Sequence, residues 1–107
     1  MSLTAISFYP PVTPNLDVEF REAETNDLFD PAVVTFYLLP PGGTELVSYV
    51  VGTDNEATRL STGKFRLRRV YSKDDAGEWQ WHVEGDQTVS KYGAFTILEN
   101  LPKSIEV

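Results

Sequence analysis

The chain has 107 residues, no cysteine and a formal net charge of −7. Its length is that of one domain with one hydrophobic core, and the lack of cysteine excludes disulfides and thiolate chemistry, as in a reducing compartment or a particle assembled in one. The acidic balance argues against nucleic acid as a partner, because contacts with phosphates need a basic surface. No apolar stretch is long enough to cross a membrane, and residues 1–14 contain no lysine or arginine, so no signal peptide is expected.

The first third of the chain predicts an arm or first strand, then a further strand and a loop. Residues 1–14 are predicted to be an N-terminal arm or a first strand, interrupted by Pro10, Pro11 and Pro14. Residues 15–21 alternate between apolar and polar side chains, which is typical of a half-buried strand. Residues 22–31 are polar and predict a loop.

The middle of the chain predicts a central strand followed by shorter ones. Residues 32–39 are apolar on both faces, as a central strand should be, and a Pro-Pro-Gly-Gly turn follows at residues 40–43. Residues 45–51 predict the next strand. After a turn at residues 52–55, residues 57–60 predict a short strand that ends in Ser-Thr-Gly.

The last third predicts three longer strands. Residues 64–71 alternate strictly, with Phe65, Leu67 and Arg69 on one face. A corner turn at residues 72–77 precedes a strand at residues 78–84, and a hairpin loop at residues 85–90 leads to a closing strand at residues 91–98.

These elements predict an all-β fold, an Ig-like β-sandwich of about seven antiparallel strands at residues 15–98. A small barrel is the alternative arrangement for this number of strands. Residues 99–107 show no pattern bounded by turns and predict a C-terminal tail. Both ends of the chain are either arms that become ordered on neighbouring subunits or frayed termini.

An Asp-x-Gly turn followed directly by an aromatic strand is the most informative local pattern. Asp75 and Gly77 form the turn, and Trp79 and Trp81 share the inward face of the strand that follows. In Ig-like sandwiches, an aromatic ring just after such a turn locks the corner before strand F. We expect Asp75 to accept backbone N–H bonds in the turn. The predicted structural core comprises Phe36, Phe65, Leu67, Asp75, Gly77, Trp79, Trp81 and Phe95.

The charges are segregated along the sequence. Residues 17–30 hold six acids and one arginine, whereas residues 59–73 hold six basic residues and no acid. This segregation predicts either a dipolar surface that docks onto copies of the chain or a charged partner, or two solvated faces of edge strands. The candidate interface residues are Arg59, Lys64, Arg66, Arg68, Asp17 and Glu19.

Residue types that could carry chemistry do not form a recognisable constellation. His82, the only histidine, lies on the predicted outward face, and no cysteine or second histidine could share a zinc ion with it. Asp74 and Asp75 are neighbours whose side chains should point apart, and residues 53–56 predict a polar turn rather than a calcium loop. We therefore predict no catalytic, metal or cofactor-binding site and no enzymatic activity.

Three groups of phrases occur together in one order. They are Asp30-Pro31, Val33-Val34-Thr35-Phe36 and Pro41-Gly42-Gly43; Gly52-Thr53-Asp54, Ala57-Thr58-Arg59 and Ser61-Thr62-Gly63-Lys64-Phe65; and Asp75-Ala76-Gly77-Glu78-Trp79-Gln80-Trp81-His82-Val83-Glu84-Gly85. This order resembles small Ig-like β-sandwich proteins encoded among the virion genes of tailed bacteriophages and prophages. The resemblance covers residues 30–97.

The resemblance implies a non-enzymatic virion structural protein, folded in the bacterial cytoplasm and present in many copies. Its partners would be capsid, connector or tail subunits and its own copies, and we place it in the head or head–tail region, as a capsid decoration or connector accessory. The alternative is an Ig-like adhesion module that recognises a host-surface glycan or protein. That alternative predicts an exposed aromatic platform, for example Tyr9, Tyr37 or Tyr92 beside loop carboxylates.

Overall fold

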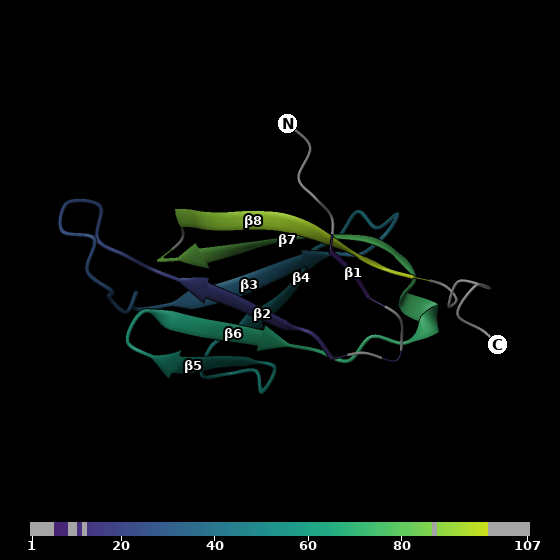
Figure 1. Ribbon diagram of the computed structural model, residues 1–107, viewed down its shortest axis with the longest axis horizontal. Helices are drawn as coiled ribbons and strands as arrows, with labels where there is room; N and C mark the ends of the chain where they lie inside the picture. The colour runs from purple at the N-terminus through teal and green to yellow at the C-terminus, as the bar shows by residue number, and fades with distance from the viewer. Residues whose placement is uncertain (1–5, 9–10, 12, 87, 99–107) are drawn as a thin grey trace.

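The strands form two separate sheets that share one core (Figure 1). The computed structural model describes residues 6–8, 11, 13–86 and 88–98. A five-stranded sheet has the order β1-β8-β7-β3-β4, and a three-stranded sheet has the order β2-β6-β5. The elements are β1 (Ile6–Phe8), β2 (Asn15–Glu19), β3 (Val34–Leu39), β4 (Val47–Val50), β5 (Ala57–Ser61), β6 (Lys64–Arg68), the 3-10 turn η1 (Lys73–Asp75), β7 (Gly77–Gly85) and β8 (Thr88–Ile97). The predicted tail and residues 1–5 of the predicted arm lie outside the described residues.

The all-β prediction is confirmed, and the two distinct sheets are consistent with a β-sandwich rather than the small barrel. Residues 15–98 form seven strands, β2 to β8, as the sequence predicts, and the described pairings among them are antiparallel. Residues 6–8 add β1, in line with the first-strand alternative for residues 1–14. The sequence does not predict the parallel pairing of β1 with β8. β2 belongs to the other sheet, so β1 and β2 do not form a hairpin. β1 instead pairs with β8 at the edge of the five-stranded sheet.

The connection between β7 and β8 is tighter than the loop predicted at residues 85–90. β7 continues to Gly85 and β8 begins at Thr88. Asp86 adopts a left-handed backbone conformation, with φ of 55°, which allows the tight reversal. Its amide donates to the Val33 carbonyl at 2.8 Å, and its Oδ1 accepts the Val33 amide at 2.9 Å. These two hydrogen bonds fix the hairpin to the start of β3.

The core lies between the sheets, because both contribute to one cluster of buried side chains. The three-stranded sheet contributes Val18, Ala57, Phe65 and Leu67, and the five-stranded sheet contributes Val34, Phe36, Leu38, Trp79, Val83, Phe95 and Ile97. Five predicted core residues are buried, none of them more than 7% exposed: Phe36, Phe65, Leu67, Trp79 and Phe95. Trp81 is only partly buried. Gly93 lies opposite it on β8, so no side chain covers the indole from that position.

Asp75 and Gly77 hold the corner before β7 rather than filling the core. Asp75 Oδ2 accepts the backbone N–H of Ser72 at 2.8 Å, as the sequence predicts for this turn. The indole N–H of Trp79 donates to the Asp75 carbonyl at 2.8 Å. The Trp79 ring lies parallel to Phe95, at 3° and 6.2 Å between centroids, and meets Tyr71 edge-on at 5.2 Å. The corner is therefore fixed to the core through a single indole ring.

Gly77 lets this corner pack against the turn that follows β3. It has φ of +127°, and a Cβ atom at this position would lie 2.6 Å from Pro41 Cβ. Any larger residue would need both an unfavourable backbone conformation and a displaced proline ring.

We predict that Gly77→Ala destabilises the protein by at least about 1 kcal/mol more than Gly52→Ala, measured by urea unfolding. Gly52 is the matched control, because it also has a positive φ, +91°, but a Cβ atom added there would meet nothing within 4 Å. Both substitutions place a residue with a Cβ atom at a positive φ, which is unfavourable, and only Gly77→Ala adds the clash with Pro41. Equal losses for the two variants would contradict the close packing of the corner.

Candidate interaction surfaces

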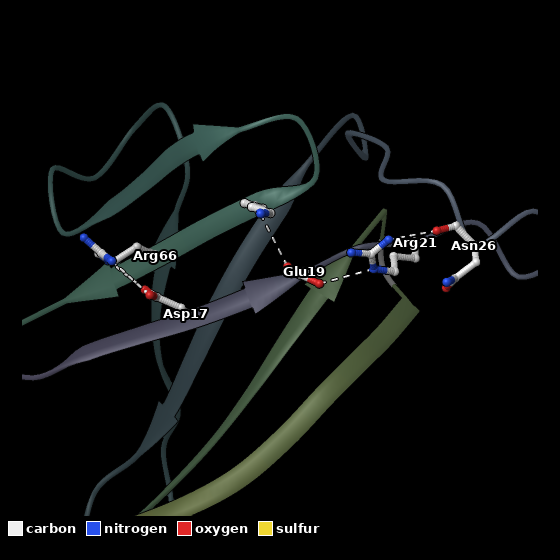
Figure 2. Close-up of polar contacts among 6 residues, drawn as sticks. Asp17, Glu19, Arg21, Asn26 and Arg66 are labelled. Atoms are coloured by element: carbon white, nitrogen blue, oxygen red, sulfur yellow. Dashed lines mark hydrogen bonds and ion pairs between the residues drawn. The ribbon is translucent and has the colours of Figure 1, made fainter.

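The predicted interface charges meet one another across two neighbouring strands (Figure 2). The antiparallel register of β2 and β6 places Asp17 opposite Arg66, and Glu19 opposite Lys64. Arg66 Nε and Nη2 donate to the two carboxylate oxygens of Asp17 at 2.7 and 2.9 Å, in a bidentate pair. Lys64 Nζ lies 3.8 Å from Glu19. The acidic and basic stretches, separate in the sequence, therefore lie side by side in space.

The other predicted interface arginines, Arg59 and Arg68, lie on the same sheet. Arg59 forms an ion pair with Asp30 at 2.9 Å, and the other oxygen of Asp30 accepts the Gly63 amide at 2.8 Å. Arg68 is exposed at the end of β6. Arg21, which was not predicted, joins this surface by donating to Glu19 at 3.2 Å. Much of the charge in the acidic and basic stretches is therefore neutralised by ion pairs within the chain.

These contacts shift the acids toward the ionised form. The hydrogen bond from Arg66 lowers the pKa of Asp17, against a smaller opposing effect of burial. The hydrogen bonds from Arg59 and from the Gly63 amide lower the pKa of Asp30. Each carboxylate is therefore more stable ionised in the folded chain than free in water.

Three ring side chains cross the outer face of the five-stranded sheet. Tyr37 on β3 lies opposite His82 on β7, which lies opposite Tyr92 on β8. The Tyr37 and His82 rings are stacked, at 4.6 Å between centroids and 16° between planes. His82 Nε2 lies 3.4 Å from Glu84, and Tyr92 is 74% exposed. Tyr37 and Tyr92 are two of the three residues predicted for an aromatic platform, and the third, Tyr9, lies outside the described residues.

A shallow hollow lies beside this row. Its volume is about 390 Å³, and Gln80 and His82 supply polar groups to it. Its other lining residues are Leu39, Leu46, Trp81, Tyr92, Gly93 and Ala94. The hollow offers an aromatic ring, an amide and an imidazole within one small surface.

A second, apolar groove opens between the two sheets beside β8. Its volume is about 200 Å³, and Trp81 lines it from β7 together with Leu16 from β2 and Phe8 from β1. Pro14, Asn15, Leu67, Tyr71, Tyr92, Gly93, Ala94 and Phe95 complete the lining. The sequence predicts that Trp81 lies in the core, but its indole is only partly buried and lines this groove.

Arg69 lies partly buried at one end of the sandwich, on the inward side that the alternation predicts. Its guanidinium carbon lies 4.8 Å from the Tyr71 ring centroid and 4.9 Å from that of Trp79. Its Nε donates to the Tyr49 hydroxyl at 2.9 Å, which joins the end of β6 to β4 on the other sheet. Burial raises the pKa of Tyr71 to about 12, although the charge of Arg69 opposes this shift. The cluster holds the Arg69 cation against two aromatic rings at the edge of the core.

The remaining residues that were considered for catalysis or metal binding stabilise turns. Asp54 Oδ2 accepts the Val50 amide at 2.7 Å, so the polar loop at residues 53–56 is held by its own carboxylate. Of the adjacent acids, Asp75 is engaged by Ser72 and Asp74 is exposed. Among the described residues, no three histidine, cysteine or acidic side chains are placed to hold a metal ion.

No protein-family model matches the chain, and no curated protein matches it at a significant level. Within the described part of the chain, no helix has the length and apolar character needed to span a membrane.

We predict that acid weakens the fold partly through Asp17 and Asp30. Because their pKa values are lowered from 3.8, their contribution to stability is present above about pH 4 and is lost as the pH falls through the lowered values. The double variant Asp17→Asn/Asp30→Asn should show a shallower fall in the free energy of unfolding below pH 4, measured by urea unfolding. Arg66→Gln, which removes the partner of Asp17, should also flatten the slope. An unchanged slope in both variants would contradict the ion-pair assignment.

Proposed function

We propose that the fold is Ig-like. The strand orders support this topology, with β2, β6 and β5 as strands B, E and D, and β3, β7 and β8 as strands C, F and G. β4 then occupies the C′ position beside strand C. The corner before β7 adds support, because the Trp79 indole bonds back to the Asp75 carbonyl, as the tyrosine-corner hydroxyl bonds back to the backbone in Ig domains.

We propose that the protein is a non-enzymatic structural component of a tailed-bacteriophage virion, assembled in the bacterial cytoplasm. The observation that carries the proposal is that the phrases behind the resemblance coincide with the turns of the sandwich. Pro41 to Gly43 follow β3, Gly52 to Asp54 follow β4, and Thr62 and Gly63 join β5 to β6. Side chains of these phrases serve the scaffold, as Asp30 does in holding Gly63.

Protein neighbours are the partners that this proposal names. They are capsid, connector or tail subunits and further copies of the chain, in the head or head–tail region, without nucleic acid, membrane or cofactor. The paired charges of β2 and β6 remain partly exposed, so they can still exchange partners with a neighbour that presents complementary charges. Such contacts would set orientation more than affinity.

The test is co-purification with the products of the neighbouring virion genes, at low and at moderate salt. The proposal predicts a stable complex with at least one capsid, connector or tail protein, and density for the chain in electron micrographs of the assembled particle. A purified protein that joins none of them at either salt concentration would refute the virion role.

A second candidate function is an adhesion module for a host-surface glycan or protein. The row of Tyr37, His82 and Tyr92 favours it, because an exposed ring beside polar groups suits stacking on a sugar. This candidate predicts binding on a glycan array that Tyr92→Ala abolishes. Leu60→Ala, at a 47% exposed position on the other sheet, is the control that should leave binding unchanged. An array without binding would remove the glycan version of this candidate.

A further inference from the structure

Most of one edge of β8 is unpaired within the described residues. β8 spans Thr88–Ile97 and pairs along its length with β7 on one side. On its other side, β1 pairs only with Phe95, Thr96 and Ile97 (Figure 1). An unpaired edge presents backbone N–H and C=O groups that can pair with another strand.

β8 has two features that usually protect edge strands, a lysine and a bulge, and both lie at the start of the regular edge. Lys91 is the only charged residue in β8, and β8 contains no proline. Val83 pairs with Lys91, and the next residue, Glu84, pairs with Val89, so Ser90 forms a β-bulge. A regular edge therefore remains at residues 91–94, directly before the part that β1 covers.

The apolar groove lies beside this regular edge. Gly93 and Ala94 line it from the edge itself, while Trp81 and Leu16 line it from the two sheets. Gly93 is required there, because a Cβ atom at this position would lie 2.8 Å from Nε1 of Trp81. Lys91, the first residue of this edge, lines a further hollow with Phe20 and Phe29. The hollowed surface therefore extends beyond residues 91–94.

We propose that residues 91–94 accept an extended segment of a neighbouring protein as an added strand in line with β1. Side chains on alternate positions of that segment point to one face, so one or two of them, apolar in character, enter the groove against Trp81 and Leu16. The inference rests on the proposed function, in that the neighbour is a subunit of the same particle.

An extended polypeptide fits this place better than a small ligand does. A small apolar molecule could fill the groove but would leave the backbone groups of β8 unpaired. A strand satisfies both features, because its main chain bonds to the edge while its alternate side chains fill the groove. β1 already uses the same edge of β8 in this manner, with Phe8 packed edge-on against Phe95 at 6.2 Å.

The experiment selects random ten-residue peptides with the full-length chain and maps the best binder by NMR. The proposal predicts enriched peptides with apolar residues at every second position. It also predicts that addition of the best peptide shifts the amide signals of residues 91–94 and the indole N–H signal of Trp81. Selection without such peptides, or shifts confined to Tyr37 and His82, would overturn it.

N-methylation of the selected peptide supplies a matched control. In an added strand, only alternate N–H groups face β8, so methylating one alternate set should weaken binding at least tenfold and methylating the other should have little effect. Equal effects of the two sets would overturn strand addition.

Variants of the protein test the groove separately from the edge. Leu16→Gln should weaken peptide binding about tenfold, whereas Leu60→Gln, at an exposed position of β5, should not. Urea unfolding of each variant checks that it is folded. Peptide binding that appears only after residues 1–5 are deleted would overturn the proposal, because the chain itself would then block the edge.

The outcomes separate this inference from the proposed function. A chain that joins virion proteins but selects no such peptide overturns the added strand alone. A chain that selects and binds such peptides at residues 91–94, but joins no virion protein, supports the added strand and counts against the virion role.

Discussion

The position of one indole ring, that of Trp79, determines how the corner, the core and the two sheets fit together. Its N–H donates to the Asp75 carbonyl, its face lies parallel to Phe95, and the guanidinium of Arg69 lies 4.9 Å from its centre. Arg69 in turn donates to Tyr49 on the five-stranded sheet. In a domain without cysteine, this chain of contacts joins the two sheets at one end of the molecule. Removing the ring would leave a large cavity and a carbonyl without its hydrogen-bond donor. Each of these changes lowers the free energy of unfolding.

The surfaces of the two sheets differ in what they offer a partner. The outer face of the three-stranded sheet carries ion pairs such as Asp17 with Arg66, whose charges are already compensated, so contacts there should confer orientation more than affinity. The five-stranded sheet offers the exposed ring of Tyr92 on its face and, among the residues that the structure describes, an unpaired backbone edge at residues 91–94. Backbone pairing and burial of apolar groups contribute more to affinity than exposed charges do. We therefore expect the principal contacts with neighbours on the side of β8.

The alternation of apolar and polar residues predicted the strands well. It could not predict the contacts that depend on how the strands are aligned with one another. Strict alternation at residues 64–71 correctly placed Phe65, Leu67 and Arg69 on one inward face, but it could not indicate that Tyr49, 20 residues away, would receive the Arg69 hydrogen bond. The acidic and basic stretches were visible in the sequence, whereas their pairing follows from the register of β2 with β6. The groove depends on Gly93 lying opposite Trp81, which no local pattern encodes.

Hydrogen exchange at the indole N–H of Trp79, followed by NMR, tests the central claim most directly. If this proton is held by the Asp75 carbonyl inside the core, it should exchange only through global unfolding, with a free energy of opening equal to that of the slowest backbone amides. The indole N–H of Trp81, at the margin of the groove, should exchange much faster. Exchange of the Trp79 proton at the rate of a free indole would contradict the account.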